Sequence, residues 1–420
     1  MNTVAVGTLL GRRLDRLRSS GASPAASPPV GRDDHAAPLA LAIGGRVVRH
    51  ELGSVVVREE VMELPIEVDR LASLPYPIDP AAPLVCIDLE TTGLATAAGT
   101  LPFLVGVGVW QHDRLRLDQL LLPDHSDERA LLEILRTLLP ADGWLVTYNG
   151  KCFDWPLLTA RYRLHRRDPP VHAGHLDLLP VARQLWKHRL GGARLAIVEQ
   201  AICGVERTDD LPGHLIPERY FGYLRSRRAG MLAPVVEHNR QDIVSLARLL
   251  AVLAEQVAPP HSWAAAHPGD LFGLARGYAR RRRPAEALAV IEAALAADAW
   301  SRGLEGGAGL HRELSAERAR LLGRLGRRSE AFTAWLDIAA RGGPGAGIAW
   351  LHVARYREHV ERDIGGALTA CQQALTVADR ARAWGEPLYA VESDLQRRLP
   401  RLRRRAFRRR PLNPGVRRAA

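Results

Sequence analysis

Cysteine is scarce and scattered in this chain of 420 residues. The four cysteines lie at positions 86, 152, 203 and 371, and no two of them form a C-x-x-C pair. Disulfide frameworks and zinc sites need closer or patterned spacing. The cysteines therefore exclude a disulfide-rich secreted domain and favour reduced thiols in a cytosolic protein.

Long apolar runs are also missing. The longest, such as positions 101–110, are too short to span a bilayer. The N-terminus carries Arg12, Arg13, Asp15 and Arg16 without a long apolar core, which is not typical of a signal peptide. We expect a soluble, cytoplasmic protein without a membrane partner.

Acidic residues are absent from 397–420, where eleven arginines lie. The formal net charge of the chain is +12, so only +1 (12 minus 11) is left for the other residues. A basic segment on a nearly neutral body indicates an anionic partner for that segment. We expect nonspecific contacts with nucleic-acid phosphates, and the alternative is a solvated tail without further function.

The remaining composition is globular, with 47% hydrophobic and 25% charged residues, and the length allows two or three domains. Stretches rich in Pro, Gly, Ser and Ala predict linkers. We divide the chain into an N-terminal helix with a flexible linker (1–38), a small β-rich lead-in (39–82), an α/β domain (83–258), an all-α helical domain (264–396) and a basic, disordered tail (397–420).

Short apolar runs predict strands in the α/β domain, and apolar residues at helical spacing predict its helices. Strands that alternate with helices favour a mixed sheet covered by helices. We predict strands at 84–90, 103–110, 115–122 and 144–148, helices at 130–139, 153–165, 176–186, 195–202 and 231–257, and a loop at 209–217.

The helical domain contains three predicted pairs of helices, at 271–295, 313–339 and 350–378. Ala287 and Ala331, which begin second helices, are 44 positions apart, and Ala331 and Ala367 are 36 apart. These intervals lie near the ~34-residue period of tetratricopeptide repeats, and the glycine-rich segment 303–309 can absorb the excess. Such repeats favour a protein partner, and the alternative is a plain antiparallel bundle.

The first acidic motif is P-L-V-C-I-D-L-E-T-T-G-L, at 83–94. Because side chains alternate along a strand, Asp88 and Glu90 point to the same face. Two adjacent carboxylates repel each other unless a cation lies between them, and Mg²⁺ prefers such oxygen ligands. By itself, Asp-x-Glu is also common on solvated surfaces.

Two further motifs follow, Y-N-G-K-C-F-D-W-P at 148–156 and E-H-N-R-Q-D at 237–242. Asp154 begins a predicted helix, where a carboxylate could act only by stabilising the first turn. His238 and Asp242 are four positions apart and share one helix face, where a surface pair is the alternative. Each motif alone is too common to indicate a functional site. The three motifs in this order along the chain are more specific.

Together these motifs resemble the three exonuclease motifs of the DEDD superfamily, which has a ribonuclease-H-like fold. The second is similar to that of the proofreading domain in family-B DNA polymerases. The whole arrangement, over about 83–257, resembles the YprB-type ribonuclease-H-like family, in which tetratricopeptide repeats often follow this domain. The segments H-L-D-L-L at 175–179 and D-D-L-P-G at 209–213 also resemble that family.

The resemblance implies a site for two Mg²⁺ or Mn²⁺ ions, which would assist the hydrolysis of phosphodiester bonds. We predict a two-metal nuclease, specifically a 3′→5′ exonuclease that takes the 3′ end of single-stranded DNA or RNA. The alternative is a non-catalytic nucleic-acid-binding scaffold that recruits partners through its helices, which would have no need of four acids. The implied metal ligands are Asp88, Glu90, Asp154 and Asp242.

His238 departs from the superfamily pattern. A histidine five positions before the last aspartate, or a tyrosine four positions before it, orients the attacking water in that superfamily. His238 is four positions before Asp242, and Glu237 occupies the other position. His238 either orients or deprotonates the water or only hydrogen-bonds Asp242.

The remaining candidates are residues that contact the substrate or support the acids. Tyr148 and Phe153 could stack on exposed bases, although aromatic residues so placed are often part of a core. Asn149 could contact the substrate or orient an acid. The candidates for support behind the acids are His175, Asp177 and Asn239.

Overall fold

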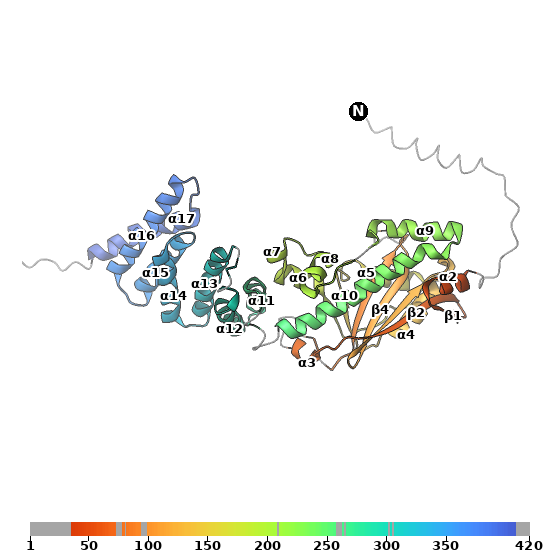
Figure 1. The fold of residues 1–420 in the computed structure, drawn as a ribbon. Helices are drawn as coiled ribbons and strands as arrows, with labels where there is room; N and C mark the ends of the chain where they lie inside the picture. Colours follow the sequence, from red (N-terminus) through yellow and green to blue (C-terminus); the bar gives the residue numbers. More distant parts are fainter. Residues whose placement is uncertain are drawn as a thin grey trace, which may run out of the picture.

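The computed structural model describes residues 35–72, 78–79, 81–93, 99–207, 210–257, 263, 266–300, 303–304 and 306–408. The predicted N-terminal helix lies outside these residues, as does most of the predicted linker. A layered α/β domain occupies the first part of the chain and an array of helices extends from one end of it (Figure 1).

The α/β domain is built on one mixed, seven-stranded sheet with the order β1-β2-β5-β4-β3-β6-β7. The pairs β3–β6 and β6–β7 are parallel and the others are antiparallel. The predicted mixed sheet is therefore confirmed. The strands are β1 (Arg46–His50), β2 (Gly53–Glu63), β3 (Leu84–Thr91), β4 (Pro102–Gln111), β5 (Arg114–Leu121), β6 (Trp144–Thr147) and β7 (Gly174–Asp177).

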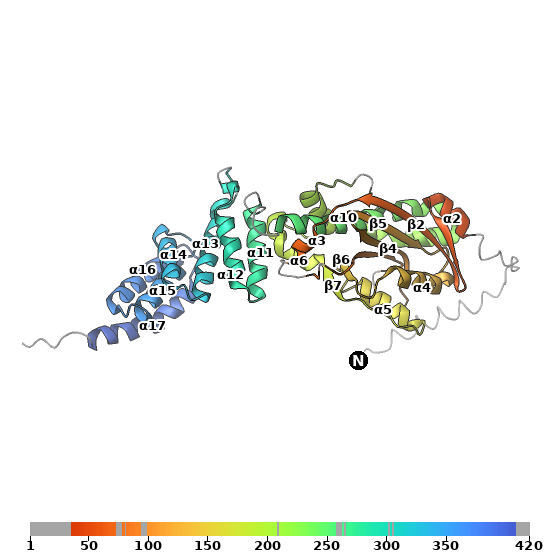
Figure 2. The ribbon, with the colours of Figure 1, turned by 90° about the horizontal axis from the view of Figure 1, so that it is seen from below.

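Helices cover both faces of the sheet (Figure 2). On one face, Leu84 and Cys86 of β3 share a core with apolar residues of α10 (Ala233–Val257). On the other face, Val85 and Ile87 share a core with α4 (Glu128–Leu138) and α5 (Asp154–Leu164). Because side chains alternate, the even-numbered positions of β3 face α10.

Glycines let α10 lie close to the sheet. A Cβ atom at Gly106 of β4 would lie 2.5 Å from the Asn239 Oδ1 atom of α10. One at Gly108 would lie 2.8 Å from the Ile243 Cγ2 atom. Because these two residues of β4 have no side chains, α10 can pack closely on the strand. The polar residues of α10 then face the end of β3.

Smaller elements complete this domain, and several of them differ from the prediction. The short parallel strand β7 begins a segment predicted as wholly helical, and α9 follows a segment predicted as a loop. A helix, α2, occupies positions predicted as linker and strand. The elements are α2 (Ala36–Ile43), α3 (Val68–Leu71), α6 (Leu178–Leu185), α7 (Lys187–Leu190), α8 (Leu195–Val198), η3 (Glu199–Cys203) and α9 (Ile216–Ser226).

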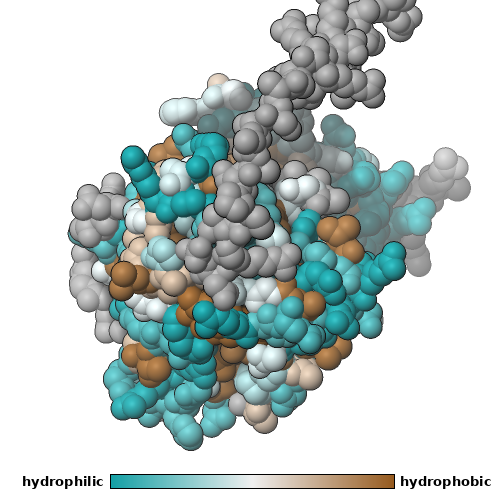
Figure 3. Space-filling model, turned by 90° about the vertical axis from the view of Figure 1, so that its right-hand side faces the viewer, coloured by the Kyte–Doolittle hydropathy of each residue, from teal (hydrophilic) through white to brown (hydrophobic). Residues whose placement is uncertain are grey.

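The predicted β-rich lead-in belongs to the main sheet, because β2 pairs along its length with β5. The domain boundaries themselves stay predictions. The surface at the end of the α/β domain away from the helical array is mainly hydrophilic, with small separate apolar areas (Figure 3). Among the described residues, no helix combines the length and the apolar character needed to cross a membrane.

The helical array confirms the predicted all-α region, and each of its helices packs against the next one along the chain. Its tetratricopeptide-like character stays a prediction. The last helix continues to Arg408, so the tail predicted to be disordered from Arg397 onward is helical at its beginning. The helices are α11 (Pro268–Arg280), α12 (Pro284–Leu295), α13 (Gly307–Arg324), α14 (Arg328–Arg341), α15 (Ala346–His359), α16 (Ile364–Ala383) and α17 (Tyr389–Arg408).

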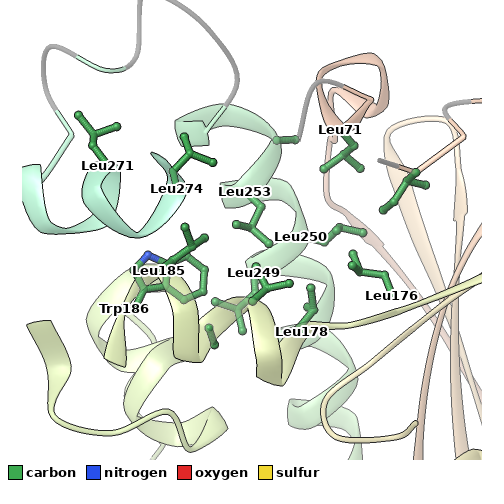
Figure 4. Close-up of a cluster of buried hydrophobic side chains, with 14 of the residues drawn as sticks. Leu71, Leu176, Leu178, Leu185, Trp186, Leu249, Leu250, Leu253, Leu271 and Leu274 are labelled. Carbon is green, nitrogen blue, oxygen red and sulfur yellow. The ribbon is translucent and has the colours of Figure 1, made fainter. Parts of the chain in front are cut away.

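A shared core joins the array to the α/β domain. Leu185 and Trp186, at the end of α6, belong to the same cluster of buried side chains as Leu271 and Leu274 of α11 (Figure 4). At Gly273, a Cβ atom would lie 2.4 Å from the backbone oxygen of Gln184, so the two helices are in backbone contact. The array is thus attached through a packed interface as well as through the chain.

Candidate active site

One cavity of about 280 Å³ collects the acidic residues of all three motifs. It lies at the carboxyl end of β3, and α5, α9 and α10 supply its other walls. Residues separated by up to 154 positions (88 to 242) thus share one solvent-accessible space. The cavity is lined by Asp88, Leu89, Glu90, Thr91, Gly93, Phe153, Asp154, Leu157, Gly213, Ile216, Pro217, His238 and Asp242.

β3 delivers two of these acids. Asp88 and Glu90 continue the row of Leu84 and Cys86, so they face α10. The pairing of β3 with β4 is irregular at Glu90 and Thr91, where the strand ends. The acids therefore stand at the point where the sheet stops and the cavity opens.

Asp154 is the first residue of α5, and the turn before it is fixed by Asp177. The Asp177 carboxylate accepts the backbone N–H groups of Asn149 at 2.7 Å and Lys151 at 3.3 Å. Asn149 has a φ angle of 70°, a left-handed conformation that asparagine tolerates better than most residues. Asp177 thus shapes the loop that carries Asp154 to the cavity, from outside the cavity wall.

Asn239 of α10 supports Asp88 directly. This fully buried amide donates to the Asp88 Oδ2 atom at 2.9 Å, and its own oxygen accepts from Gln119 Nε2 at 2.9 Å. Gln119 also donates to the backbone oxygen of Val236 at 2.7 Å. A chain of hydrogen bonds from β5 through α10 therefore fixes the orientation of the Asp88 carboxylate.

His238 lies among the acids. Its Nε2 atom is 3.6 Å from Asp242 Oδ2 and 3.9 Å from Glu90 Oε1. Its Nδ1 atom is 2.6 Å from Asp210 Oδ1. Ligand atoms of Glu90, His238 and Asp242 all lie within 4.8 Å of one another, a separation that allows one cation to contact all three.

All four cavity acids have raised pKa values. Burial, followed by repulsion from Asp242 and Asp154, raises the pKa of Asp88 well above its ordinary value. Burial and repulsion from Asp88 do the same to the pKa of Glu90, and burial with repulsion from Asp177 raises the pKa of Asp154 to about 7. Burial also raises the pKa of Asp242, against the opposing effect of His238 and Arg207. Four ionised carboxylates in this space require added positive charge, so the donor set fits hard divalent cations.

Arg207 is a site residue that the sequence did not reveal. Its mostly buried guanidinium donates to Asp242 Oδ1 at 2.5 Å, to Glu199 Oε2 at 2.9 Å and to Asp210 Oδ2 at 3.2 Å. Burial alone would lower the pKa of this guanidinium, but the bonds to Glu199 and Asp242 raise it above its ordinary value. Arg207 thus brings a permanent positive charge to the acid that closes the third motif.

Asp210 is the second residue whose place was not foreseen. It lies in the D-D-L-P-G segment, whose first aspartate is outside the described residues. Its carboxylate contacts both His238 and Arg207. The family resemblance of this segment was the only signal in the sequence, and it did not specify a partner.

The other predicted contact residues separate into two groups. Phe153 lines the cavity and remains 49% exposed. Tyr148 does not line it, because its hydroxyl donates to the backbone oxygen of Ala193 at 2.6 Å and its ring packs against the core. Asn149 also lies outside the cavity lining.

His175 contacts the residues on either side of the turn that precedes Asp154. Its Nε2 atom is 2.8 Å from the Thr147 hydroxyl, and its ring packs edge-on against Trp155. Burial, with smaller effects of Lys151 and His172, lowers the pKa of His175 to about 4. The side chain is therefore neutral near pH 7 and touches none of the cavity acids within the described structure.

Comparison with known proteins agrees with this fold. A family model described as the RNase_H superfamily matches residues 85–254, from β3 to α10. With a relative at 30% identity, this shows that the chain belongs to the RNase_H superfamily. The relative is the uncharacterized protein YprB of Bacillus subtilis (strain 168), which matches over 298 residues, 70% of each chain. The predicted resemblance to the YprB-type family is confirmed.

Membership of this superfamily indicates a nuclease that hydrolyses phosphodiester bonds. Domains of this kind bind nucleic acid and generally use divalent metal ions. The acidic cavity at the end of β3 is a candidate for such a metal site.

The raised pKa of Asp154 predicts a pH-dependent loss of stability without metal. A carboxyl whose pKa is higher in the folded than in the unfolded state binds protons preferentially when folded, so stability falls as pH rises from about 4 to about 7. In EDTA, Asp154→Asn should therefore raise the unfolding free energy at pH 8 by roughly 1–3 kcal/mol. At pH 4.5 the gain should be much smaller, because the acid of the folded wild type is then still protonated.

Thermal unfolding followed by circular dichroism at both pH values checks this. The exposed Asp113→Asn, on the turn between β4 and β5, is the matched control and should leave the pH dependence unchanged. Equal effects of Asp154→Asn at pH 4.5 and pH 8 would contradict the electrostatic account of the cavity.

Proposed function

We propose that this protein is a two-metal-dependent 3′→5′ exonuclease that degrades single-stranded DNA or RNA. The observation that carries the proposal is the convergence of four carboxylates and one imidazole on a single open cavity. A non-catalytic scaffold, the alternative from the sequence, offers no reason to gather four acids in one cavity.

The oxygen ligands for two Mg²⁺ or Mn²⁺ ions would come from Asp88, Glu90, Asp154 and Asp242. Bound ions would lower the pKa of a water molecule and neutralise the departing 3′ oxygen. The chain contributes the arrangement of the ligands, in which Asn239 orients Asp88 and Arg207 holds Asp242.

His238 is the proposed proton acceptor. When Nδ1–H donates to the Asp210 carboxylate, the tautomer is fixed and Nε2 carries a free lone pair. That nitrogen faces the Glu90 and Asp242 carboxylates, where a water molecule beside the acids can reach it. Asp210 acts through His238 and is therefore a positioning residue.

Phe153 supports the choice of a single-stranded substrate. Its half-exposed ring lines the cavity beside Asp154, where it can stack on an unpaired base. The cavity, at about 280 Å³, is close to the lower end of the range for small-molecule sites, which suits one terminal nucleotide better than a duplex.

Loss of a single metal-site acid should abolish cleavage. With Mg²⁺ or Mn²⁺, wild type should shorten 5′-labelled single-stranded DNA or RNA stepwise, whereas Asp88→Asn and Asp242→Asn should be slower by more than about 100-fold. Gel analysis of 5′- and 3′-labelled oligonucleotides measures both rate and polarity.

Asp113→Asn, with the same loss of charge outside the cavity, should cleave like wild type. Wild-type protein that degrades neither DNA nor RNA, or an Asp88→Asn protein as active as wild type, would contradict the proposal. Release of the 5′-terminal nucleotide first would contradict its polarity.

Asp210→Asn tests the positioning of His238. We expect kcat to fall by about tenfold with KM within about threefold, because the imidazole tautomer is no longer fixed while the substrate contacts persist. His238→Gln should cost more, and the double variant should be no slower than His238→Gln alone, since the two residues act as one unit. Steady-state kinetics of all three variants measure this, and independent, multiplicative losses would contradict it.

A further inference from the structure

The last helix, α17, lies at the end of the helical array farthest along the chain from the α/β domain (Figure 1). It contains most of the arginines of the acid-free C-terminal segment. These arginines divide into two sets that point in different directions. The division shows which of them are needed for folding.

One set anchors the helix to the array. Arg398, Arg401 and Arg405 donate to the fully buried carboxylate of Glu358 on α15, at 2.8, 2.7 and 2.7 Å. The buried Leu395 and other apolar residues of the same face pack in the core of the array. Burial of Glu358 requires these cations, because a buried carboxylate without partners is strongly destabilising.

The second set faces solvent. Arg397, Arg403, Arg404 and Arg408 are exposed, and no acid pairs with them among the residues that the structure describes. Arg397, Arg404 and Arg408 follow the spacing of one helix face and span roughly 16 Å at 1.5 Å per residue. The helix dipole accounts for cations in the last turn, but Arg397 and Arg403 lie outside that turn.

Aromatic side chains accompany this second set. Phe407 is 75% exposed and lies beside the arginine row on α17. Tyr389 is 73% exposed at the start of the same helix, and Trp384 is 83% exposed at the end of α16. Arginines that track phosphates together with aromatic rings that stack on bases are the combination found in proteins that bind single-stranded nucleic acid.

We propose that this surface binds single-stranded nucleic acid, away from the cavity and without any role for metal. The α17 basic face is Arg397, Arg403, Arg404 and Arg408 together with Phe407. It holds the strand through its phosphates and one stacked base, so it contributes affinity rather than chemistry. The inference takes its class of ligand from the proposed function but makes a separate claim about where that ligand is held.

Binding without cleavage tests the proposal. In EDTA, fluorescence anisotropy with a labelled single-stranded oligonucleotide measures the affinity of the full chain from 50 to 300 mM salt. Replacing all four arginines of the face by Gln should weaken binding at least tenfold and make the slope of log K against log[salt] shallower by about three. Phe407→Ala should weaken binding to the single strand about tenfold without changing that slope.

The matched control removes four exposed arginines from α13 and α14, by Arg312→Gln, Arg324→Gln, Arg328→Gln and Arg341→Gln. It carries the same loss of charge and should bind within about twofold of wild type. Circular dichroism checks that both quadruple variants remain folded, as expected because the three arginines bound to Glu358 are retained.

Equal weakening by the two quadruple variants would overturn the proposal, since general charge would then explain the binding. Unchanged binding by the α17 variant would also overturn it and would assign this face to another partner, such as an acidic protein. A wild type that binds through this face but cleaves nothing would contradict the nuclease and leave this proposal standing.

Discussion

Repulsion among four carboxylates in one cavity is the constraint on which the rest of this structure depends. Asp88, Glu90, Asp154 and Asp242 come from three separate elements. Burial raises the pKa of each, and repulsion from the other acids raises the pKa values of Asp88, Glu90 and Asp154 further. Such an arrangement is unfavourable for folding by itself. A bound cation would offset this repulsion, and the residues around the acids also reduce its cost.

The fold meets this constraint in two ways. Buried hydrogen bonds orient the acids, as in the chain from Gln119 through Asn239 to Asp88. A fixed positive charge then reduces the repulsion, because Arg207 binds Asp242 while Glu199 and Asp210 hold the guanidinium in place. The glycines of β4 allow this polar side of α10 to lie directly over the end of β3.

The sequence was most informative where function and local periodicity coincide. Alternation along β3 placed Asp88 and Glu90 on one face, and the spacing of four placed His238 and Asp242 together on α10. The strands β3, β4 and β6 were predicted because each contains a short apolar run, and β5 because its leucines recur along a short segment that follows β4. These features depend on neighbours in the chain, so they can be derived without the fold.

Other features depend on contacts between distant segments. Arg207 resembles any loop arginine until Glu199 and Asp242 are brought to it, and Tyr148 resembles a stacking residue until its hydroxyl reaches Ala193. The four-residue strand β7 has too few side chains for alternation to be visible. The part of α17 from Arg397 onward was predicted as a disordered tail because its arginines suggest solvation, whereas three of them bind the buried carboxylate of Glu358 on α15 and hold the helix against the array.

The central claim is that the fold gathers these acids into one site for paired cations. Calorimetric titration of wild-type protein with Mn²⁺ at pH 8 tests it most directly, with Asp88→Asn measured alongside. The account predicts saturable binding of about two ions per chain to wild type and loss of at least one of them in Asp88→Asn. Absence of saturable binding, or identical binding by the two proteins, would contradict it.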